Sequence, residues 1–481
     1  MIHSLRQLFE HITGKEAAQQ ITITASGSNR KYYRLISEDE KISLIGVVGT
    51  SLDENNAFLY MIEHFTKCGL NVPKLVGVSD DRMCYLQEDL GDTLLFDFIA
   101  DGRKTGVFCL EEKEMLSKTI TALARFQIQG AKDFDFSQCY PQPEFNERSI
   151  RWDLNYFKYC FLKATELDFQ ENLLENDFEK LTNILLKAPN NAFMYRDFQS
   201  RNVMITGKGE PYFIDFQGGR KGPVYYDVAS FLWQAKANFH QELRAELIAQ
   251  YIDELEKYTY VDRAEFYQTL QHFVIFRIMQ VLGAYGFRGY FEKKPHFLQS
   301  IPFALKNLKQ CLAKDMKEYP YLAETLLRLT KMKQFNESSN IKPLVVRIYS
   351  FAYKKGIPQD ESGNGGGFVF DCRGINNPGK YTKYAHFTGL DEPVIDFMES
   401  NKEVFPFLQA TYKLVDPTIK RYIDRGFQSL MICFGCTGGK HRSVYLAEKM
   451  ALHVSERFGV EVQLVHREQD IAKEFPAKSQ E

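Results

Sequence analysis

The sequence contains no apolar run close to the roughly 20 residues that a membrane-spanning helix requires. Its first twenty residues are polar and mixed in charge, unlike a secretory signal peptide. The nine cysteines follow no repeating spacing, which is typical of reduced thiols and not of a disulfide framework. Together these absences predict a cytoplasmic protein that does not engage a membrane.

An excess of either charge is also missing. The chain has 60 Lys and Arg against 62 Asp and Glu, so its formal net charge of -2 gives no overall basic bias toward nucleic acid. Hydrophobic residues make up 44% and charged residues 25%, as in ordinary globular proteins. The 481 residues exceed what one core normally organises, and no internal repeat is present, so we expect two or three domains.

The order of the predicted elements separates two lobes in residues 1–330. Short strand-like segments at 21–24, 31–36 and 43–48 dominate the first ninety residues. The stretches 111–130, 145–190 and 224–330 follow a helical period, and between them 202–205 and 212–216 predict a β-hairpin. This pattern predicts a bilobal α+β domain, with a small β-rich lobe followed by a large helical lobe.

The pattern changes at residues 331–342, which lose periodicity and gain Ser and Asn, so they predict a linker. From 343 to 481, predicted strands at 344–351, 368–371, 430–434 and 462–465 are joined by helical stretches, of which 443–458 is the clearest. Strands that alternate with helices indicate a separate α/β domain.

Three side chains in the first domain have the order that phosphoryl transfer from ATP requires. Asp197 is followed five residues later by Asn202, and Asp215 comes at the end of the second hairpin strand. The reaction needs a carboxylate to accept the proton of the attacking hydroxyl, and oxygen ligands for Mg²⁺ at the phosphates. The pattern predicts Asp197 as the base and the other two as metal ligands. The alternative is that each Asp only caps a turn.

This segment resembles the aminoglycoside phosphotransferase/choline kinase superfamily, and within it the bacterial anomeric kinases of N-acetylmuramate and N-acetylglucosamine. The matching stretches are residues 27–34, 87–92, 195–204, 213–217 and 222–229, and the resemblance extends over roughly 15–330. It implies a protein-kinase-like fold, ATP and Mg²⁺ as cofactors, and an amino sugar or a related cell-wall sugar as the substrate.

The resemblance also implies roles for individual residues. Asp227 would support the catalytic loop, and Asp153 is the candidate for binding a sugar hydroxyl, with a solvated helix residue as its alternative. The residues implied to bind ATP lie over the phosphates and in the hinge near adenine: Ser28, Asn29, Arg30, Lys31, Arg34, Gln87 and Asp89.

Two positions depart from the superfamily pattern. Tyr195 stands two residues before the base, where many members have histidine. The strand at 43–48 lacks the lysine that holds the α- and β-phosphates in most kinases, which leaves Arg30, Lys31 or Arg34 to supply the charge. A kinase-like domain that binds a nucleotide without turnover is therefore an open alternative.

A second motif, FGCTGGKHRS at residues 434–443, lies between a predicted strand and a predicted helix. Its glycines expose consecutive backbone N–H groups, and the helix N-terminus adds partial positive charge, as an anion site requires. It is not a Walker A loop, because His441 follows Lys440. It does fit the Cys-x₅-Arg-Ser pattern of cysteine-dependent phosphatases, with Cys436 as the nucleophile. A purely structural turn is the third interpretation.

Residues 343–467 resemble the C-terminal domain of the RNase adapter RapZ. The matching stretches are 370–373, 377–378, 388–394, 435–445 and 466–467. In that family the domain senses glucosamine-6-phosphate and binds small regulatory RNAs. The resemblance therefore implies a phosphosugar site made by Cys436, Thr437, Gly438, Gly439, Lys440, His441 and Arg442.

RNA is a weaker expectation as a partner, because the tail after residue 467 lacks the dense basic cluster that phosphate-backbone binding needs. We therefore favour a sugar kinase fused to a sugar-phosphate-sensing domain. The alternatives are an RNA-binding adapter whose kinase-like domain only senses nucleotide, and a phosphatase in the second domain.

Overall fold

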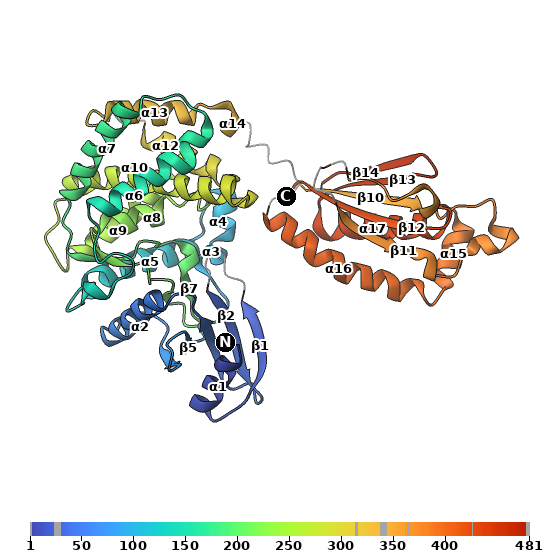
Figure 1. Ribbon diagram of the computed structural model, residues 1–481, viewed down its shortest axis with the longest axis horizontal. Helices are drawn as coiled ribbons and strands as arrows, with labels where there is room; N and C mark the ends of the chain where they lie inside the picture. Colours follow the sequence, from blue (N-terminus) through green and yellow to red (C-terminus); the bar gives the residue numbers. More distant parts are fainter. Residues whose placement is uncertain are drawn as a thin grey trace. The chain divides into compact units, whose positions relative to one another are not determined.

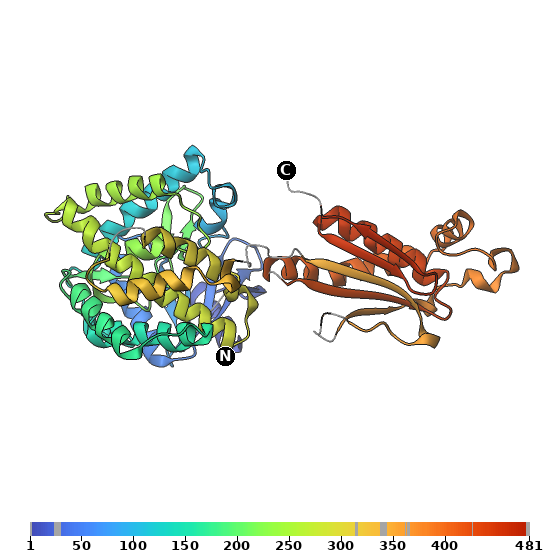
Figure 2. The same ribbon diagram turned by 90° about the horizontal axis from the view of Figure 1, so that it is seen from above.

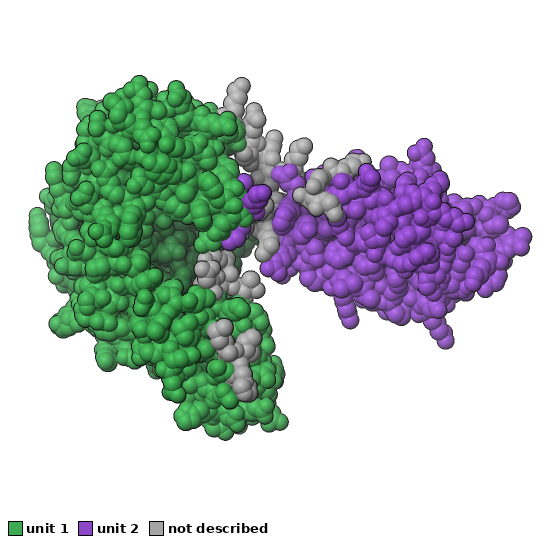
Figure 3. Space-filling model, in the orientation of Figure 1, with its two compact units in different colours: residues 1–292, 300–335 green, residues 293–299, 336–481 purple. Residues whose placement is uncertain are grey.

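A computed structural model describes residues 2–23, 30–312, 316–336, 344–360, 362, 366–425 and 427–477. Ser28 and Asn29, predicted to cover the ATP phosphates, lie outside these residues. The chain divides into two compact units, one of residues 1–292 with 300–335 and one of residues 293–299 with 336–481 (Figure 3). We call them unit 1 and unit 2. Helix α14 (Lys333–Asn336) lies within the predicted linker, whose remainder from 337 is not described.

The small lobe of unit 1 is an antiparallel sheet of five strands in the order β1-β2-β3-β5-β4. Helix α1 (Ile2–Thr13) buries Leu5 and Phe9 against this sheet, in a core that includes Leu35 and Leu86. Helix α2 (Leu52–Lys67) begins at Ser51, whose side chain accepts a hydrogen bond from the backbone N–H of the third helical residue. The strands are β1 (Ala17–Ile23), β2 (Lys31–Ser37), β3 (Ser43–Val48), β4 (Leu75–Val78) and β5 (Cys84–Glu88).

The large lobe is helical and is organised around α10 (Arg263–Gly286), which packs against α6, α8 and α12 (Figure 1). Twelve of its residues are buried, two of them glycines, since apolar residues occupy most of its circumference. The other helices of this lobe are α3 (Leu95–Phe98), α4 (Ala100–Thr105), α5 (Leu110–Gln129), α6 (Glu147–Phe157), α7 (Glu171–Leu186), α8 (Tyr225–Leu232), α9 (Gln241–Leu255), α12 (Ile301–Cys311) and α13 (Pro320–Thr330). The short helix α11 (Pro295–Leu298) belongs to unit 2.

Two short strand pairs position the catalytic segment. β6 (Ala192–Met194) pairs with β9 (Arg220–Gly222), and β7 (Val203–Ile205) pairs with β8 (Pro211–Phe213). The predicted hairpin is confirmed, but its second strand ends at Phe213 instead of 216. Asp215 adopts φ +66°, a left-handed conformation that cannot continue an extended strand.

Unit 2 is an α/β domain, as predicted, with the strand order β11-β12-β10-β13-β14. The first four strands are parallel and β14 runs antiparallel at the edge. Helix α17 (Arg442–Phe458) packs on β10, β12 and β13, with Ala447 and Ala451 in the shared core (Figure 2). The elements are β10 (Val345–Ala352), β11 (Gly367–Asp371), α15 (Glu392–Ser400), α16 (Val404–Arg425), β12 (Ser429–Cys436), β13 (Glu461–His466) and β14 (Ile471–Phe475).

The fold class expected from the sequence is confirmed: a bilobal, protein-kinase-like α+β unit precedes a separate α/β domain. Within the described ranges, no helix combines the length and the apolar character that crossing a bilayer would need.

Candidate functional site

The loop that carries the predicted base is fixed by Asp227 of helix α8. The buried carboxylate of Asp227 accepts hydrogen bonds from the backbone N–H groups of Tyr195 at 2.8 Å and Arg196 at 2.9 Å. It also accepts one from Nε2 of Gln127 on α5 at 2.8 Å. Asp227 therefore holds two consecutive residues of this loop by their main chain. Its role in supporting catalysis stays a prediction.

Tyr195, the residue that departs from the family histidine, is fully buried. Its hydroxyl donates a hydrogen bond to the carbonyl of Ile214, next to the predicted metal ligand Asp215. Burial raises the pKa of Tyr195 well above its ordinary value, so this hydroxyl stays protonated and remains a donor. Tyr195 thus connects the loop of the base to the loop of the metal ligand.

Replacing Asp227 by alanine is expected to lower the free energy of unfolding of unit 1 by about 3 kcal/mol or more, because three donors lose a buried acceptor. Thermal or denaturant unfolding measures this, and the exposed Asp80→Ala variant is the control, expected to shift stability by under ~0.5 kcal/mol. Equal stability of the two variants would contradict the supporting role of Asp227.

A pH dependence accompanies this role. Burial raises the pKa of Asp227 to about 7, although the backbone N–H groups of Tyr195 and Arg196 and the side chain of Gln127 act in the opposite direction. The folded state then holds this proton more tightly than the unfolded chain, in which a carboxyl titrates near about 4. Protonation of Asp227 therefore adds to the free energy of unfolding below about pH 4, and this addition is lost as the pH rises toward 7. In Asp227→Ala we expect this dependence of the unfolding free energy on pH to disappear.

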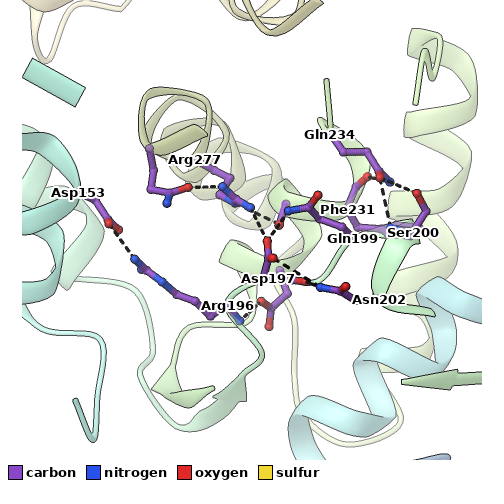
Figure 4. A network of polar contacts seen from close by, with 12 residues as sticks. Asp153, Arg196, Asp197, Gln199, Ser200, Asn202, Phe231, Gln234 and Arg277 are labelled. Atoms are coloured by element: carbon purple, nitrogen blue, oxygen red, sulfur yellow. Dashed lines mark hydrogen bonds and ion pairs between the residues drawn. The ribbon is translucent and has the colours of Figure 1, made fainter. Parts of the chain in front are cut away.

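Asp197, the predicted base, has a half-exposed side chain that its neighbours orient (Figure 4). Arg277 of α10 lies with Nη2 3.1 Å from Oδ1 of Asp197, and Gln199 donates to the same oxygen. Nδ2 of Asn202 donates to the backbone carbonyl of Asp197 at 2.8 Å. The carboxylate is therefore fixed on one side by a buried guanidinium, while its exposed side can receive a hydroxyl group.

Asp153 lies on α6 and is buried, so the alternative that it is a solvated helix residue is wrong. Its Oδ1 accepts a hydrogen bond from Nη2 of Arg196 at 2.8 Å (Figure 4). Its Oδ2 has no hydrogen-bond partner among the described residues. The ion pair ties the residue before the base to the helical lobe, and sugar binding by Asp153 stays a prediction.

A cavity of about 400 Å³ in unit 1 is lined by both the small sheet and the large lobe. Figure 3 shows unit 1 hollowed on the face turned toward the viewer. Gln87 lines the cavity, and its buried Oε1 has no partner in the part of the chain that the structure describes, so it is an available acceptor. The cavity brings together six of the predicted residues: Arg30, Arg34, Gln87, Asp89, Asn202 and Asp215.

The three residues that could supply the charge of the missing lysine, Arg30, Lys31 and Arg34, lie in different environments. Lys31 is exposed at the start of β2. Arg34 is paired with Asp89 at 2.7 Å and with Asp92 at 2.8 Å, so its guanidinium braces the hinge. Arg30 alone of the three is buried within the cavity wall.

Arg30 is held by helix α2. Its Nη2 lies 3.4 Å from Oε1 of Glu54 and 3.3 Å from the carbonyl of the same residue, and Nη1 lies 3.4 Å from the hydroxyl of Tyr85. The guanidinium also lies over the ring of Phe58, 5.3 Å from its centroid. Arg30 is electrostatically coupled to Asp215, and its charge counteracts the raised pKa of that carboxyl.

The oxygen atoms of Asp215 and Asn202 are suitable ligands for a magnesium ion. Burial raises the pKa of Asp215 and the nearby Asp197 adds to this effect, while a hydrogen bond from Gln217 and the charge of Arg30 oppose it. A divalent cation would relieve the electrostatic effect of Asp197 on Asp215, and Asn202, which lines the same cavity as Asp215, could add an amide oxygen. Among the described residues no group of three or more His, Cys, Asp or Glu could hold a metal, so the phosphates would complete the coordination.

In unit 2 the predicted anion loop joins β12 to α17. Sγ of Cys436 accepts a hydrogen bond from the backbone N–H of Gly439 at 3.2 Å and lies 3.2 Å from the hydroxyl of Ser443. Burial acts to raise the pKa of Cys436, but these hydrogen bonds and the charge of Arg442 outweigh it and lower that pKa. Gly439 has φ +64°, and a Cβ there would lie 2.9 Å from the backbone N of Ala352, so glycine is required.

The three basic side chains of the loop are turned toward backbone carbonyls. Lys440 donates to Ala385 at 2.7 Å, and Nε2 of His441 lies 3.3 Å from the carbonyl of Tyr384. Nη1 of Arg442 donates to the carbonyls of Arg373 and Ile375 at 2.9 and 2.7 Å. The lowered pKa of Cys436 is in line with the phosphatase interpretation. The hydrogen bonds of Arg442 to two carbonyls speak against it, because they direct this guanidinium away from the loop.

Thr437 and Arg442 line a polar cavity of about 820 Å³ beside the loop. Three cations that the sequence did not single out, Arg373, Lys380 and Lys402, line it as well, against one acid, Glu403. The buried Nδ2 of Asn401 has no partner within the described residues. An excess of cations and amide donors suits an anionic ligand.

Two family models match the chain. The phosphotransferase enzyme family matches residues 21–266, and the RapZ C-terminal domain matches residues 344–470. A curated nucleotide-binding protein of Pseudothermotoga lettingae is 34% identical over 172 residues, which are 35% of this chain and 59% of that protein. One of Xanthomonas campestris pv. campestris is 41% identical over 131 residues, 27% of this chain and 45% of that protein. The chain thus spans 45% and 59% of the length of these relatives.

Two solved structures of kinases are similar to this chain. An ethanolamine kinase of Plasmodium vivax is 13% identical with a TM-score of 0.41, over 66% of this chain and 84% of that kinase. A choline kinase of Streptococcus pneumoniae is 14% identical with a TM-score of 0.40, over 60% of this chain and 94% of that kinase.

Proposed function

Because the chain belongs to the phosphotransferase enzyme family and carries a RapZ C-terminal domain, we propose that it is an ATP-dependent sugar kinase with an attached sugar-phosphate-binding domain. The observation that carries the kinase proposal is the arrangement of Asn202 and Asp215 in one cavity wall, beside the half-exposed carboxylate of Asp197. The proposed acceptor is a hydroxyl of an amino sugar or a related cell-wall sugar.

In this proposal Asp197 orients the acceptor hydroxyl and accepts its proton on Oδ2, since Oδ1 faces Arg277. Arg30 holds the α- and β-phosphates, and its ion pair with Glu54 fixes the guanidinium toward the cavity. Gln87 accepts a hydrogen bond from the adenine amino group. Mg²⁺, bound by Asn202 and Asp215, would neutralise phosphate charge when present.

The choice of a sugar rests on the resemblance of five stretches to kinases of N-acetylmuramate and N-acetylglucosamine, namely 27–34, 87–92, 195–204, 213–217 and 222–229. ATP consumption with Mg²⁺ tests it across glucosamine, N-acetylglucosamine, N-acetylmuramate, choline and an aminoglycoside. Turnover on one sugar that is lost in Asp197→Ala supports the proposal. ATP binding without turnover on the whole panel would refute it and favour a nucleotide-sensing adapter.

For unit 2 we expect a sugar phosphate such as glucosamine-6-phosphate to bind the cavity beside the anion loop, and glucosamine itself not to bind there. Removing one cation of the cavity with Lys402→Gln is expected to weaken binding about 10-fold or more, the effect of one charge-assisted hydrogen bond.

Isothermal titration calorimetry of the full chain measures this binding. Lys413→Gln is the matched control, because Lys413 is an exposed lysine on the neighbouring helix α16 and does not line the cavity. Equal affinity of the two variants would contradict a ligand in this cavity.

A further inference from the structure

Two cysteines of unit 2 are neighbours where the parallel strands β11 and β12 end. The register of these strands places Phe370 opposite Phe434, and the centroids of the two rings lie 5.3 Å apart. Side chains of a strand alternate between its two faces, so the next pair on the same face is Cys372 and Cys436. Both cysteines are buried in the core cluster that also contains Phe434.

The spacing of this pair suits a disulfide bond. Neighbouring strands lie about 4.8 Å apart, within the Cα separation of about 4.4–6.8 Å that a disulfide needs. Cys372 stands just beyond the last ladder pair of β11 and begins a single 3-10 turn, so the ladder does not fix its position. Cys433 lies on the opposite face of β12, in a separate core cluster. Three residues of strand separate it from Cys436 by about 10 Å, which is too far for a bond.

The two sulfur atoms differ in reactivity. Burial acts to raise the pKa of Cys436, but the hydrogen bonds within the anion loop outweigh this effect and lower that pKa. Burial raises the pKa of Cys372 well above its ordinary value, and the neighbouring Cys436 adds to this effect. The thiolate is the form that peroxides oxidise, so Cys436 suits the role of nucleophile and Cys372 that of the thiol that reacts second.

The pair borders the polar cavity of about 820 Å³ beside the anion loop. Residues 373–375, which follow Cys372, and Thr437, which follows Cys436, all line this cavity. Arg442 connects the two walls, since it lines the cavity and donates to the carbonyls of residues 373 and 375. The cavity therefore reaches the residues that immediately follow both cysteines.

We propose that Cys372 and Cys436 form a redox pair, which a hydroperoxide entering through this cavity converts into a reversible disulfide. The thiolate of Cys436 attacks the outer peroxide oxygen, the O–O bond breaks, and an alkoxide or hydroxide leaves with the electron pair. Sγ of Cys372 then attacks the resulting sulfenic acid, forms the S–S bond and releases water. An anion held in the cavity opposes the first step, because it blocks the approach and disfavours the thiolate.

Peptide mapping of the full chain after treatment with hydrogen peroxide tests the disulfide. Trypsin should release residues 356–373 joined to residues 426–440, and dithiothreitol should separate them. Cys433→Ser is the matched control, because Cys433 lies in the second peptide but on the opposite face, and this variant must still form the bond. Cys372→Ser and Cys372→Ala must not form it. Absence of the joined peptides in the native wild type, or their presence in either Cys372 variant, would overturn the inference.

The route through the cavity is tested by the rate of disulfide formation. Glucosamine-6-phosphate at about ten times its Kd, measured by calorimetry, is expected to slow the reaction about 10-fold, because roughly one molecule in ten is then free. Glucosamine should not slow it, and oxidation of the exposed Cys109 of unit 1 is the internal reference. An unchanged rate with the ligand bound would overturn the route. If glucosamine-6-phosphate does not bind, the sugar-phosphate proposal fails, while the peptide mapping still decides the disulfide.

Discussion

Replacing Asp197 by asparagine is expected to lower kcat for the sugar by about 10²- to 10⁴-fold, the usual contribution of a positioned general base. Asparagine keeps the size of the side chain and an oxygen for Arg277, whose Nη2 lies 3.1 Å from Oδ1 in the wild type, but it cannot accept the proton. KM for ATP should change little, because Asp197 does not line the nucleotide cavity. A coupled assay of ADP release measures both constants.

Arg277 makes a stability check necessary for this variant. Its guanidinium is buried and loses a charged partner when Asp197 becomes neutral, although it retains Ser230 at 3.1 Å. Thermal unfolding must therefore show that the variant is folded at the assay temperature, with Asp80→Asn as the matched exposed control. A folded Asp197→Asn protein with the kcat of the control would remove Asp197 from the role of base.

The sequence predicted the parts of this site that are contiguous in the chain. Asp197, Asn202 and Asp215 stand within twenty residues of one another, and the local turns of the loop and hairpin bring them together. Arg277 and Glu54 were missed, because they reach the site from helices distant in sequence. The one available signal for Arg277 was a charged residue inside an otherwise apolar helical stretch, which needs a buried partner.

The anion loop shows the same limit. Its strand-loop-helix context was correctly predicted, because an apolar run, a glycine-rich turn and an amphipathic helical stretch follow one another in the sequence. The side-chain directions were not predictable: Lys440 and Arg442 are captured by carbonyls of residues 373–385, whose position depends on tertiary packing. For the same reason Lys380 and Lys402, which lie far from the motif in sequence, were not recognised as lining the neighbouring cavity.

Two elements of unit 2, α16 and β14, were not predicted from the sequence, for physical reasons that the structure shows. Helix α16 contains Pro417, which normally ends a helix, yet the helix continues through it because Val415 and Ile419 are buried in the core of unit 2. Strand β14 is short and two of its five residues are charged, as suits an edge strand, and its pairing with β13 defines it. In both cases tertiary contacts override a weak or unfavourable local pattern.

The second large effect is expected for Arg30, which we propose replaces the lysine missing from strand β3. Replacing Arg30 by methionine is expected to raise KM for ATP about 10- to 100-fold, because the change removes a buried cation of the cavity wall, proposed to hold the phosphates, and keeps the apolar stem of the side chain. Lys31→Met is the matched control, since Lys31 is adjacent, has the same charge and is exposed. Steady-state kinetics with ATP as the varied substrate compares the two.

The ion pair between Arg30 and Glu54 allows a further test of the phosphate-binding role of Arg30. If Glu54 fixes the guanidinium of Arg30, Glu54→Gln should raise KM for ATP less than Arg30→Met, and the double variant should be no worse than Arg30→Met alone. Arg30→Lys should recover only part of the affinity, because an ammonium cannot contact Glu54, Tyr85 and a phosphate in the fixed geometry of a guanidinium. If the effects of the two single changes on KM add up in the double variant, Glu54 and Arg30 act independently. If KM for ATP is unchanged in Arg30→Met, Arg30 does not hold the phosphates and another cation must do so.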